Sequence, residues 1–219
     1  MTRTLLLRPT QLRALGWLAL PFLVACGTEV GIGAGEKPPV AEPPGGDDDN
    51  LGSPPDDWDS CLEGWRGQYS NLAADNKYVT PGPRIDVPTT VEGLALWDDP
   101  EYEQFDPSLD FGQNFWPIDE GLEEDPKYFA VYWHSWIRAK SRTTLSFLLG
   151  SSDDAFVYVN GAPVAENPGI HGFVRTRYDI NLDPGVYPIE VWFAHRGSPD
   201  AAMSFRHIEG DVLFCYPDF

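Results

Sequence analysis

The chain of 219 residues is poor in cysteine, histidine and basic side chains, and each shortage removes a class of function. Its three cysteines form no C-x-x-C pair and its four histidines show no close spacing, so no zinc-site pattern is present. Fifteen lysines and arginines stand against 34 aspartates and glutamates, which gives a net charge of −19. Such an acidic protein repels nucleic-acid phosphates, so nucleic acid is excluded as a partner.

Signatures of enzymes are missing from the sequence as well. No serine lies in a Gly-x-Ser-x-Gly elbow, and there is no glycine-rich phosphate loop. A glycosidase needs two carboxylates at a defined separation, but among 34 acidic residues a suitable pair arises easily by chance. We therefore expect a protein that is not an enzyme.

The apolar run at residues 14–24 is too short to span a bilayer comfortably. It follows three arginines and ends in small residues before Cys26. A basic region, an apolar region and small residues before a cysteine resemble a bacterial lipoprotein signal peptide. The resemblance implies that residues 1–25 are a cleaved signal peptide and that Cys26 is lipidated. An ordinary secretory signal with an incidental cysteine is the alternative.

Gly27 follows the cysteine, where an aspartate is associated with retention at the inner membrane. We therefore expect a lipid-anchored protein of the bacterial cell envelope, at the outer membrane or the cell surface, whose lipid holds it to the membrane. Residues 26–59 are rich in Gly, Pro, Glu and Asp and contain few large apolar side chains before Trp58. This composition predicts a disordered spacer.

The two remaining cysteines, Cys61 and Cys215, bracket the rest of the chain. Compartments outside the inner membrane are oxidising, and disulfides persist there. We expect a disulfide between these cysteines that ties together the two ends of a domain at residues 60–219.

Residues 60–219 are long enough to bury one core, and they show no sustained helical periodicity with caps. Turn residues such as Asn160-Gly161 separate short β-rich runs. The runs lie at residues 128–138, 143–149, 155–159, 173–180, 186–194, 201–208 and 212–216. This pattern predicts an all-β domain, an antiparallel β-sandwich or barrel. Residues 65–124 are poorer in strand signals, and we expect long ordered loops there.

Two adjacent carboxylates, Asp153 and Asp154, stand before an alternating apolar strand that ends in the Asn160-Gly161 hairpin signal. A free aspartate titrates near pH ~4, so both carboxylates are ionised at neutral pH. A hard cation that prefers oxygen ligands, such as calcium, is the natural group to offset their repulsion. A solvated Asp-Asp turn is the alternative.

Several motifs in combination resemble the PA14 domain, and more specifically its fibro-slime branch. They are Gly64-Trp65-Arg66-Gly67-Gln68-Tyr69, residues 129–138, residues 147–161, Pro168-Gly169-Ile170-His171-Gly172, Phe193-Ala194-His195-Arg196 and Ser204-Phe205-Arg206. The resemblance covers residues 64–208 and implies a β-sandwich or barrel of PA14 type. In the sugar-binding members of this family, an Asp-Asp pair joined by a cis peptide holds calcium, and sugar hydroxyls ligate the ion directly.

Carried over to this sequence, Asp153 and Asp154 would be those calcium ligands. The remaining ligands in the family are usually loop oxygens. The candidates here are Asn181, Asp183, Ser198 and Asp200, and nothing in the sequence selects among them. His171 is expected to pack or hydrogen-bond beside the aspartate pair. The hairpin residue Asn160 is a further candidate for contact with a ligand.

Tryptophans are the natural platforms for sugar rings, and two of them lie in expected loops. These are Trp97 and Trp116. Trp133 and Trp136 fall on opposite faces of one strand, so we expect at most one of them in the core. His195 stands where the fibro-slime branch commonly has a glutamate, which is a departure from the pattern.

Together these features predict a calcium-dependent carbohydrate-binding or adhesion module on a lipid-anchored envelope protein, with a glycan or polysaccharide as its partner. The alternative is a component of the envelope or extracellular matrix that contacts proteins and binds no sugar. The sequence carries no indication of oligomeric state.

Overall fold

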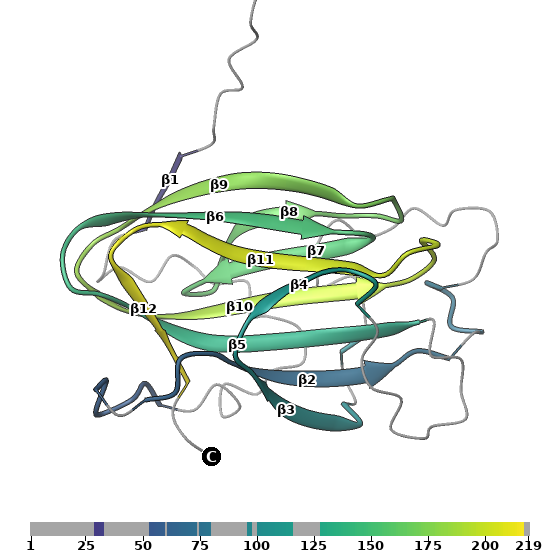
Figure 1. Cartoon of the computed structure of the whole chain (residues 1–219), viewed down its shortest axis with the longest axis horizontal. Helices are drawn as coiled ribbons and strands as arrows, with labels where there is room; N and C mark the ends of the chain where they lie inside the picture. The colour runs from purple at the N-terminus through teal and green to yellow at the C-terminus, as the bar shows by residue number, and fades with distance from the viewer. Residues whose placement is uncertain are drawn as a thin grey trace, which may run out of the picture.

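The computed structural model describes residues 29–32, 53–59, 61–73, 75–79, 96–97, 100–115 and 128–216. They form an all-β sandwich of two sheets, seen in Figure 1. The strands, in chain order, are β1 (Glu29–Ile32), β2 (Trp65–Asn71), β3 (Tyr102–Asp106), β4 (Leu109–Gln113), β5 (Phe129–Ala139), β6 (Thr143–Ser151), β7 (Asp154–Val159), β8 (Ala162–Asn167), β9 (Val174–Leu182), β10 (Gly185–His195), β11 (Ala202–Glu209) and β12 (Val212–Cys215).

One sheet has five strands in the order β1-β9-β6-β11-β4. The other has seven, in the order β3-β2-β5-β10-β7-β8, with β12 paired to β5. Neighbouring strands run antiparallel, except that β1 runs parallel to β9. The predicted antiparallel sandwich is therefore confirmed. Its strands from β5 onward lie at the β-rich runs of the sequence, except β8, which follows the predicted hairpin turn at Asn160-Gly161.

Side chains along β5 lie alternately on the inner and the outer face of its sheet. Trp133 is fully buried between the sheets, whereas Trp136, on the opposite face, is only half-buried. The split expected for these two tryptophans is confirmed. The β7–β8 hairpin also forms as predicted, and both of its turn residues, Asn160 (φ 52°) and Gly161 (φ 72°), have the positive φ that a tight hairpin turn requires.

A second cluster of apolar side chains covers the outer face of the seven-stranded sheet. Trp97 belongs to this cluster; it is 9% exposed and packs edge-on against Trp192 with ring centroids 5.2 Å apart. Its Nε1 donates hydrogen bonds of 3.1 Å to the carbonyl oxygens of Val131 and Phe193. Trp97 is therefore a core residue, and its prediction as a sugar platform is wrong.

Four strands lie where the sequence predicts none. The strands β2, β3 and β4 fall in residues 65–124, for which long loops are predicted, and β1 falls in the expected disordered spacer at residues 26–59. Three of them, β1, β3 and β4, are short and lie at sheet edges. An edge strand is half-solvated, so its sequence does not need the alternating apolar pattern by which strands are predicted.

The predicted disulfide between Cys61 and Cys215 is present, with an S–S distance of 1.97 Å and a Cα–Cα distance of 5.8 Å. It joins the segment before β2 to β12, beside the isolated bridge of Leu62 with Tyr216. Within the described ranges, no helix is long and apolar enough to cross a membrane. The predicted signal peptide and the lipidated Cys26 lie outside the described residues.

Candidate functional site

Asp153 and Asp154 lie where the chain passes from β6 in one sheet to β7 in the other. Side chains of the preceding serines fix this crossing: Ser151 Oγ donates to the carbonyl oxygen of Asp153 at 2.9 Å, and Ser152 Oγ accepts from the N–H of Ala202 at 2.8 Å. Asp153 has a φ of 67°, in the left-handed region that aspartate tolerates better than most residues. No described peptide bond is cis, so the cis Asp153–Asp154 bond implied by the family resemblance is absent.

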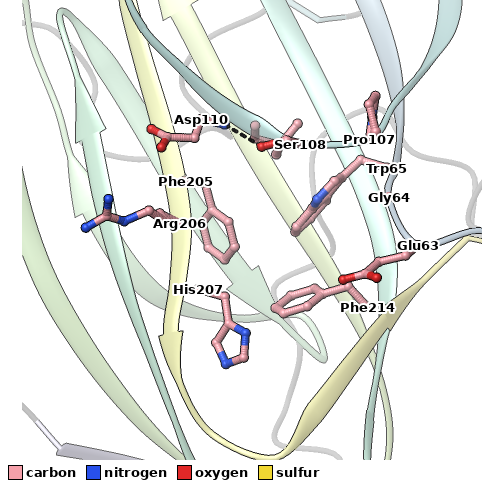
Figure 2. A pocket seen from close by; sticks show the side chains of 11 residues that line it. Glu63, Gly64, Trp65, Pro107, Ser108, Asp110, Phe205, Arg206, His207 and Phe214 are labelled. Carbon is pink, nitrogen blue, oxygen red and sulfur yellow. Dashed lines mark hydrogen bonds between the residues drawn. The ribbon is translucent and has the colours of Figure 1, made fainter.

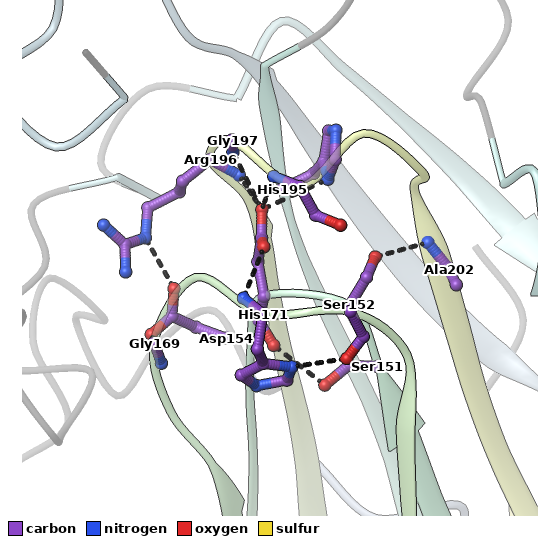
Figure 3. A network of polar contacts seen from close by, with 12 residues as sticks. Ser151, Ser152, Asp154, Gly169, His171, His195, Arg196, Gly197 and Ala202 are labelled. Carbon is purple, nitrogen blue, oxygen red and sulfur yellow. Dashed lines mark hydrogen bonds and ion pairs between the residues drawn. The ribbon is translucent and has the colours of Figure 1, made fainter. Parts of the chain in front are cut away.

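The Asp153 carboxylate is surrounded by hydrogen-bond donors, and Figure 3 labels three of the residues that supply them, His171, Arg196 and Gly197. Its Oδ2 accepts from the consecutive N–H groups of Arg196 (2.6 Å), Gly197 (2.8 Å) and Ser198 (3.1 Å). Its Oδ1 accepts from the N–H of His171 at 3.2 Å. Successive N–H groups that converge in this way form an anion-binding nest, so the β10–β11 loop is shaped around this one carboxylate.

His195 adds a further contact, because its Nδ1 lies 3.3 Å from Asp153 Oδ2 and both side chains are buried. Burial alone would raise the pKa of Asp153. The contact with His195 and the N–H groups of Ser198 and Arg196 outweigh burial and hold the pKa of Asp153 below its ordinary value. The carboxylate is therefore held in its ionised form by protein groups.

The Asp154 carboxylate is held by a loop amide and by an arginine. Its Oδ1 accepts from the N–H of Gly169 at 2.6 Å, and its Oδ2 accepts from Arg196 Nε at 2.5 Å. Arg196 also donates through Nη1 to the carbonyl oxygen of Tyr78 at 2.8 Å. Arg196 is 1% exposed and Asp154 is fully buried, so the two form a buried ion pair.

A calcium ion takes about 6–8 oxygen ligands at roughly 2.3–2.6 Å. Each carboxylate oxygen of Asp153 and Asp154 already accepts at least one hydrogen bond from a protein donor. The described residues also contain no group of three or more histidine, cysteine, aspartate or glutamate side chains placed to hold a metal. In this arrangement the two aspartates do not fit a calcium ion.

Other predicted site residues separate into two groups. His171 lies beside the aspartate pair as expected, bonded through its backbone, and exposed Asp200 follows Ser198 at the rim. Asn160 lies at the opposite end of β7, so it is not part of this site. Trp116 lies outside the described residues.

Arg196 and Gly169 contact the aspartate pair, and the sequence analysis does not single them out. Both belong to the motifs quoted for the family resemblance, but neither carries a local signal that names its partner. Arg196 stands 42 residues from Asp154 in the chain, and only the pairing of β7 with β10 brings the two together. The arginine itself indicates a buried ion pair, because a cation that follows a buried apolar strand requires an anionic partner.

A pocket of about 300 Å³ lies away from the aspartates, between β4 and β11 of one sheet and β2 and β12 of the other. In Figure 2 the rings of Trp65, Phe205 and Phe214 gather around it, and the Glu63 carboxylate lies beside Phe214. The ring centroids of Trp65 lie 5.2 Å from Phe205 and 5.5 Å from Phe214. Trp65 is 5% exposed and belongs to the core cluster, so its ring forms the buried base of this pocket, whereas Phe214 is half-buried and Glu63 is exposed.

No protein-family model matches the chain, and no curated protein sequence matches it. Among solved structures, the chain is similar to the PA14 sugar-binding domain from an RTX adhesin, with a TM-score of 0.52 and 14% identity over 72% of this chain and 99% of that one. This likeness shows that the fold is a PA14-like sandwich.

Two further solved structures match less well. One is a subtype-switched A domain of epithelial adhesin 9 from Candida glabrata in complex with beta-lactose, with a TM-score of 0.48 and 12% identity over 75% of this chain and 92% of that one. The other is a GH31 alpha-xylosidase from Xanthomonas citri, with a TM-score of 0.42 and 13% identity over 69% of this chain. The chain spans only 15% of that enzyme.

Proposed function

We propose that this domain is a carbohydrate-binding adhesion module of a cell-envelope protein. The observation that carries the proposal is the sandwich, which is similar to the sugar-binding PA14 domain of an RTX adhesin over 99% of that domain's length. The disulfide between Cys61 and Cys215 is consistent with an exported protein, because such bonds persist in oxidising compartments.

The aromatic pocket is the place that suits a sugar ring. Small-ligand pockets start at about 300 Å³ and combine an apolar wall with a few polar groups. Here the apolar C–H face of a pyranose would pack on the half-buried Phe214 ring, while its hydroxyls would donate to the exposed Glu63 carboxylate. Two loop residues, the half-buried His171 and the exposed Asp200, offer a second place for sugar contacts.

The proposed function does not depend on calcium at Asp153 and Asp154. Lipidation of Cys26 belongs to the proposal as the anchor that displays the domain. Labelled palmitate incorporated into the full chain, and lost in the Cys26→Ser variant, would support this anchor. Unchanged labelling of that variant would contradict it.

A second candidate function is a structural or protein-interaction component of the envelope that binds no sugar. The specific observation in its favour is the aspartate pair, because both side chains are fully buried and each of their four carboxylate oxygens already accepts from a protein donor.

A glycan array probed with the full chain, with and without chelator, separates the two candidates. Binding to a defined glycan supports the proposal, and no binding to any glycan contradicts it. Variants then locate the site: we expect Glu63→Gln and Phe214→Ala to lower affinity at least tenfold, which is about 1.4 kcal/mol. Arg142→Ala, at an exposed ion pair with Asp183, is the matched control and is expected to bind as the wild type does.

A further inference from the structure

The buried charge cluster at the β6–β7 crossing has no role in the proposed function. We infer that Arg196 is the resident cation of the Asp153–Asp154 pair, so that the loops around it are held together without calcium. This inference goes beyond the proposed function, because it holds whether or not the domain binds a sugar.

Arg196 contacts both carboxylates, each through a different part of the residue. Its side-chain Nε donates to Asp154 Oδ2 at 2.5 Å, and its backbone N–H donates to Asp153 Oδ2 at 2.6 Å. All three residues are at most 1% exposed. Burying a charge is strongly unfavourable unless the charge has an opposite partner and hydrogen bonds. The two carboxylates and the Arg196 guanidinium provide these for one another.

The balance of charge makes the arginine and a calcium ion alternatives. Two carboxylates carry two negative charges, which one calcium ion would neutralise completely. A buried guanidinium beside that ion would then carry an uncompensated positive charge. With Arg196 alone, one negative charge is left, and the N–H groups of Gly197 and Ser198 and the nearby His195 ring are placed to stabilise it.

The cluster joins segments that are far apart in the chain. Asp154 binds the N–H of Gly169 in the β8–β9 loop, and Asp153 binds the β10–β11 loop. Arg196 Nη1 reaches the carbonyl oxygen of Tyr78, in a segment outside both sheets. Figure 3 shows the Arg196 guanidinium directed at the Asp154 carboxylate. In a cluster held by a metal, these contacts would form only when the ion is bound. Here the protein's own side chains and N–H groups make them.

The first test is thermal unfolding of the full chain in excess calcium and after chelation. We expect the two melting curves to coincide, and calorimetric titration with calcium to give no heat of binding. A Tm that rises with calcium in the wild type, and that loses this response in Asp153→Asn, would overturn the inference. Neither measurement involves a glycan, so failure here is distinct from failure of the proposed function.

The second test removes the cation. Arg196→Met keeps the length of the side chain but leaves two buried carboxylates without a positive partner, and we expect its Tm to fall by roughly 10 °C. Adding Asp154→Asn removes one of those charges and should restore part of the loss. Arg142→Met, at an exposed ion pair, is the matched control and should shift Tm by no more than about 2 °C. If Arg196→Met melts together with Arg142→Met, the inference is wrong.

Discussion

Trp133 Nε1 donates a hydrogen bond of 2.8 Å to Oδ2 of Asp106, deep between the two sheets. The same oxygen accepts from the Tyr69 hydroxyl at 2.6 Å, and Oδ1 accepts from Gln104 Nε2 at 2.9 Å. Burial raises the pKa of Asp106 even though these three donors act to lower it. One carboxylate at the end of β3 thus connects β2, β3 and the central strand β5, and it fixes the edge of the seven-stranded sheet.

Replacing Asp106 by alanine is expected to destabilise the domain by about 3 kcal/mol, because the buried donors of Tyr69 and Trp133 lose their acceptor. Urea unfolding followed by tryptophan fluorescence measures the change. Asp183→Ala is the matched control, since Asp183 pairs with Arg142 at the surface, and it should cost less than about 1 kcal/mol. Equal losses in the two variants would contradict the role given to Asp106.

Gly67 is expected to be intolerant of alanine for the same structural reason. A Cβ at this position would lie 2.6 Å from Asp106 Oδ2 and 2.8 Å from Trp133 Nε1, so the buried network would have to move. We expect Gly67→Ala to cost about 2 kcal/mol in urea unfolding. Gly172→Ala is the control, because a Cβ there meets nothing within 4 Å, and it should leave stability unchanged.

The strands of the second half of the fold can be predicted from the sequence, because they are long and bounded by turn residues. Strands β5, β6, β7, β9 and β10 coincide within two residues with apolar runs, and the Asn160-Gly161 turn fixes one hairpin. The edge strands β3 and β4 escape prediction because their stability comes from pairing with neighbours and from buried contacts such as Asp106. Those contacts depend on residues distant in the chain.

The aspartate pair shows where sequence reasoning about a site reaches its limit. Two adjacent carboxylates before a strand correctly indicate that a partner is needed to offset their charge. That partner is Arg196, which directly follows β10. The register that places Ala194 of β10 opposite Asp154 brings Arg196 beside the pair, and no local pattern encodes this register. The prediction of Trp97 as a sugar platform is wrong for a related reason. Its neighbours in space, Trp192 and Val131, are remote in sequence.

The buried His134 is expected to make the stability of the folded protein depend on pH. Burial, assisted by the charge of Arg66, lowers the pKa of His134 to about 4, and neither ring nitrogen has a hydrogen-bond partner among the described residues. The unfolded chain therefore binds a proton between pH ~6.5 and pH ~4 that the folded protein does not, so stability is complete above this window and falls as pH decreases through it.

The loss over that window is expected to reach about 3 kcal/mol from this residue alone. His134→Phe keeps a ring between Tyr132 and Tyr216 and removes the titration, so its stability should change less between pH 7 and pH 4. Urea unfolding of both proteins across a pH series provides the measurement. Parallel pH profiles for wild type and variant would show that His134 is not the group responsible.

The disulfide is expected to make the largest single contribution to stability outside the core. Cys61 and Cys215 are separated by 154 residues, and closing so long a loop in the unfolded chain stabilises the folded state by up to about 5 kcal/mol. The double variant Cys61→Ala/Cys215→Ala should lose this amount in urea unfolding, and reduced wild type should match it. Hydrogen exchange should quicken first in β12, because that strand pairs only with β5 among the described strands and Cys215 ties its end to the start of the domain. A double variant as stable as the oxidised wild type would show that the bond contributes nothing to the folded state.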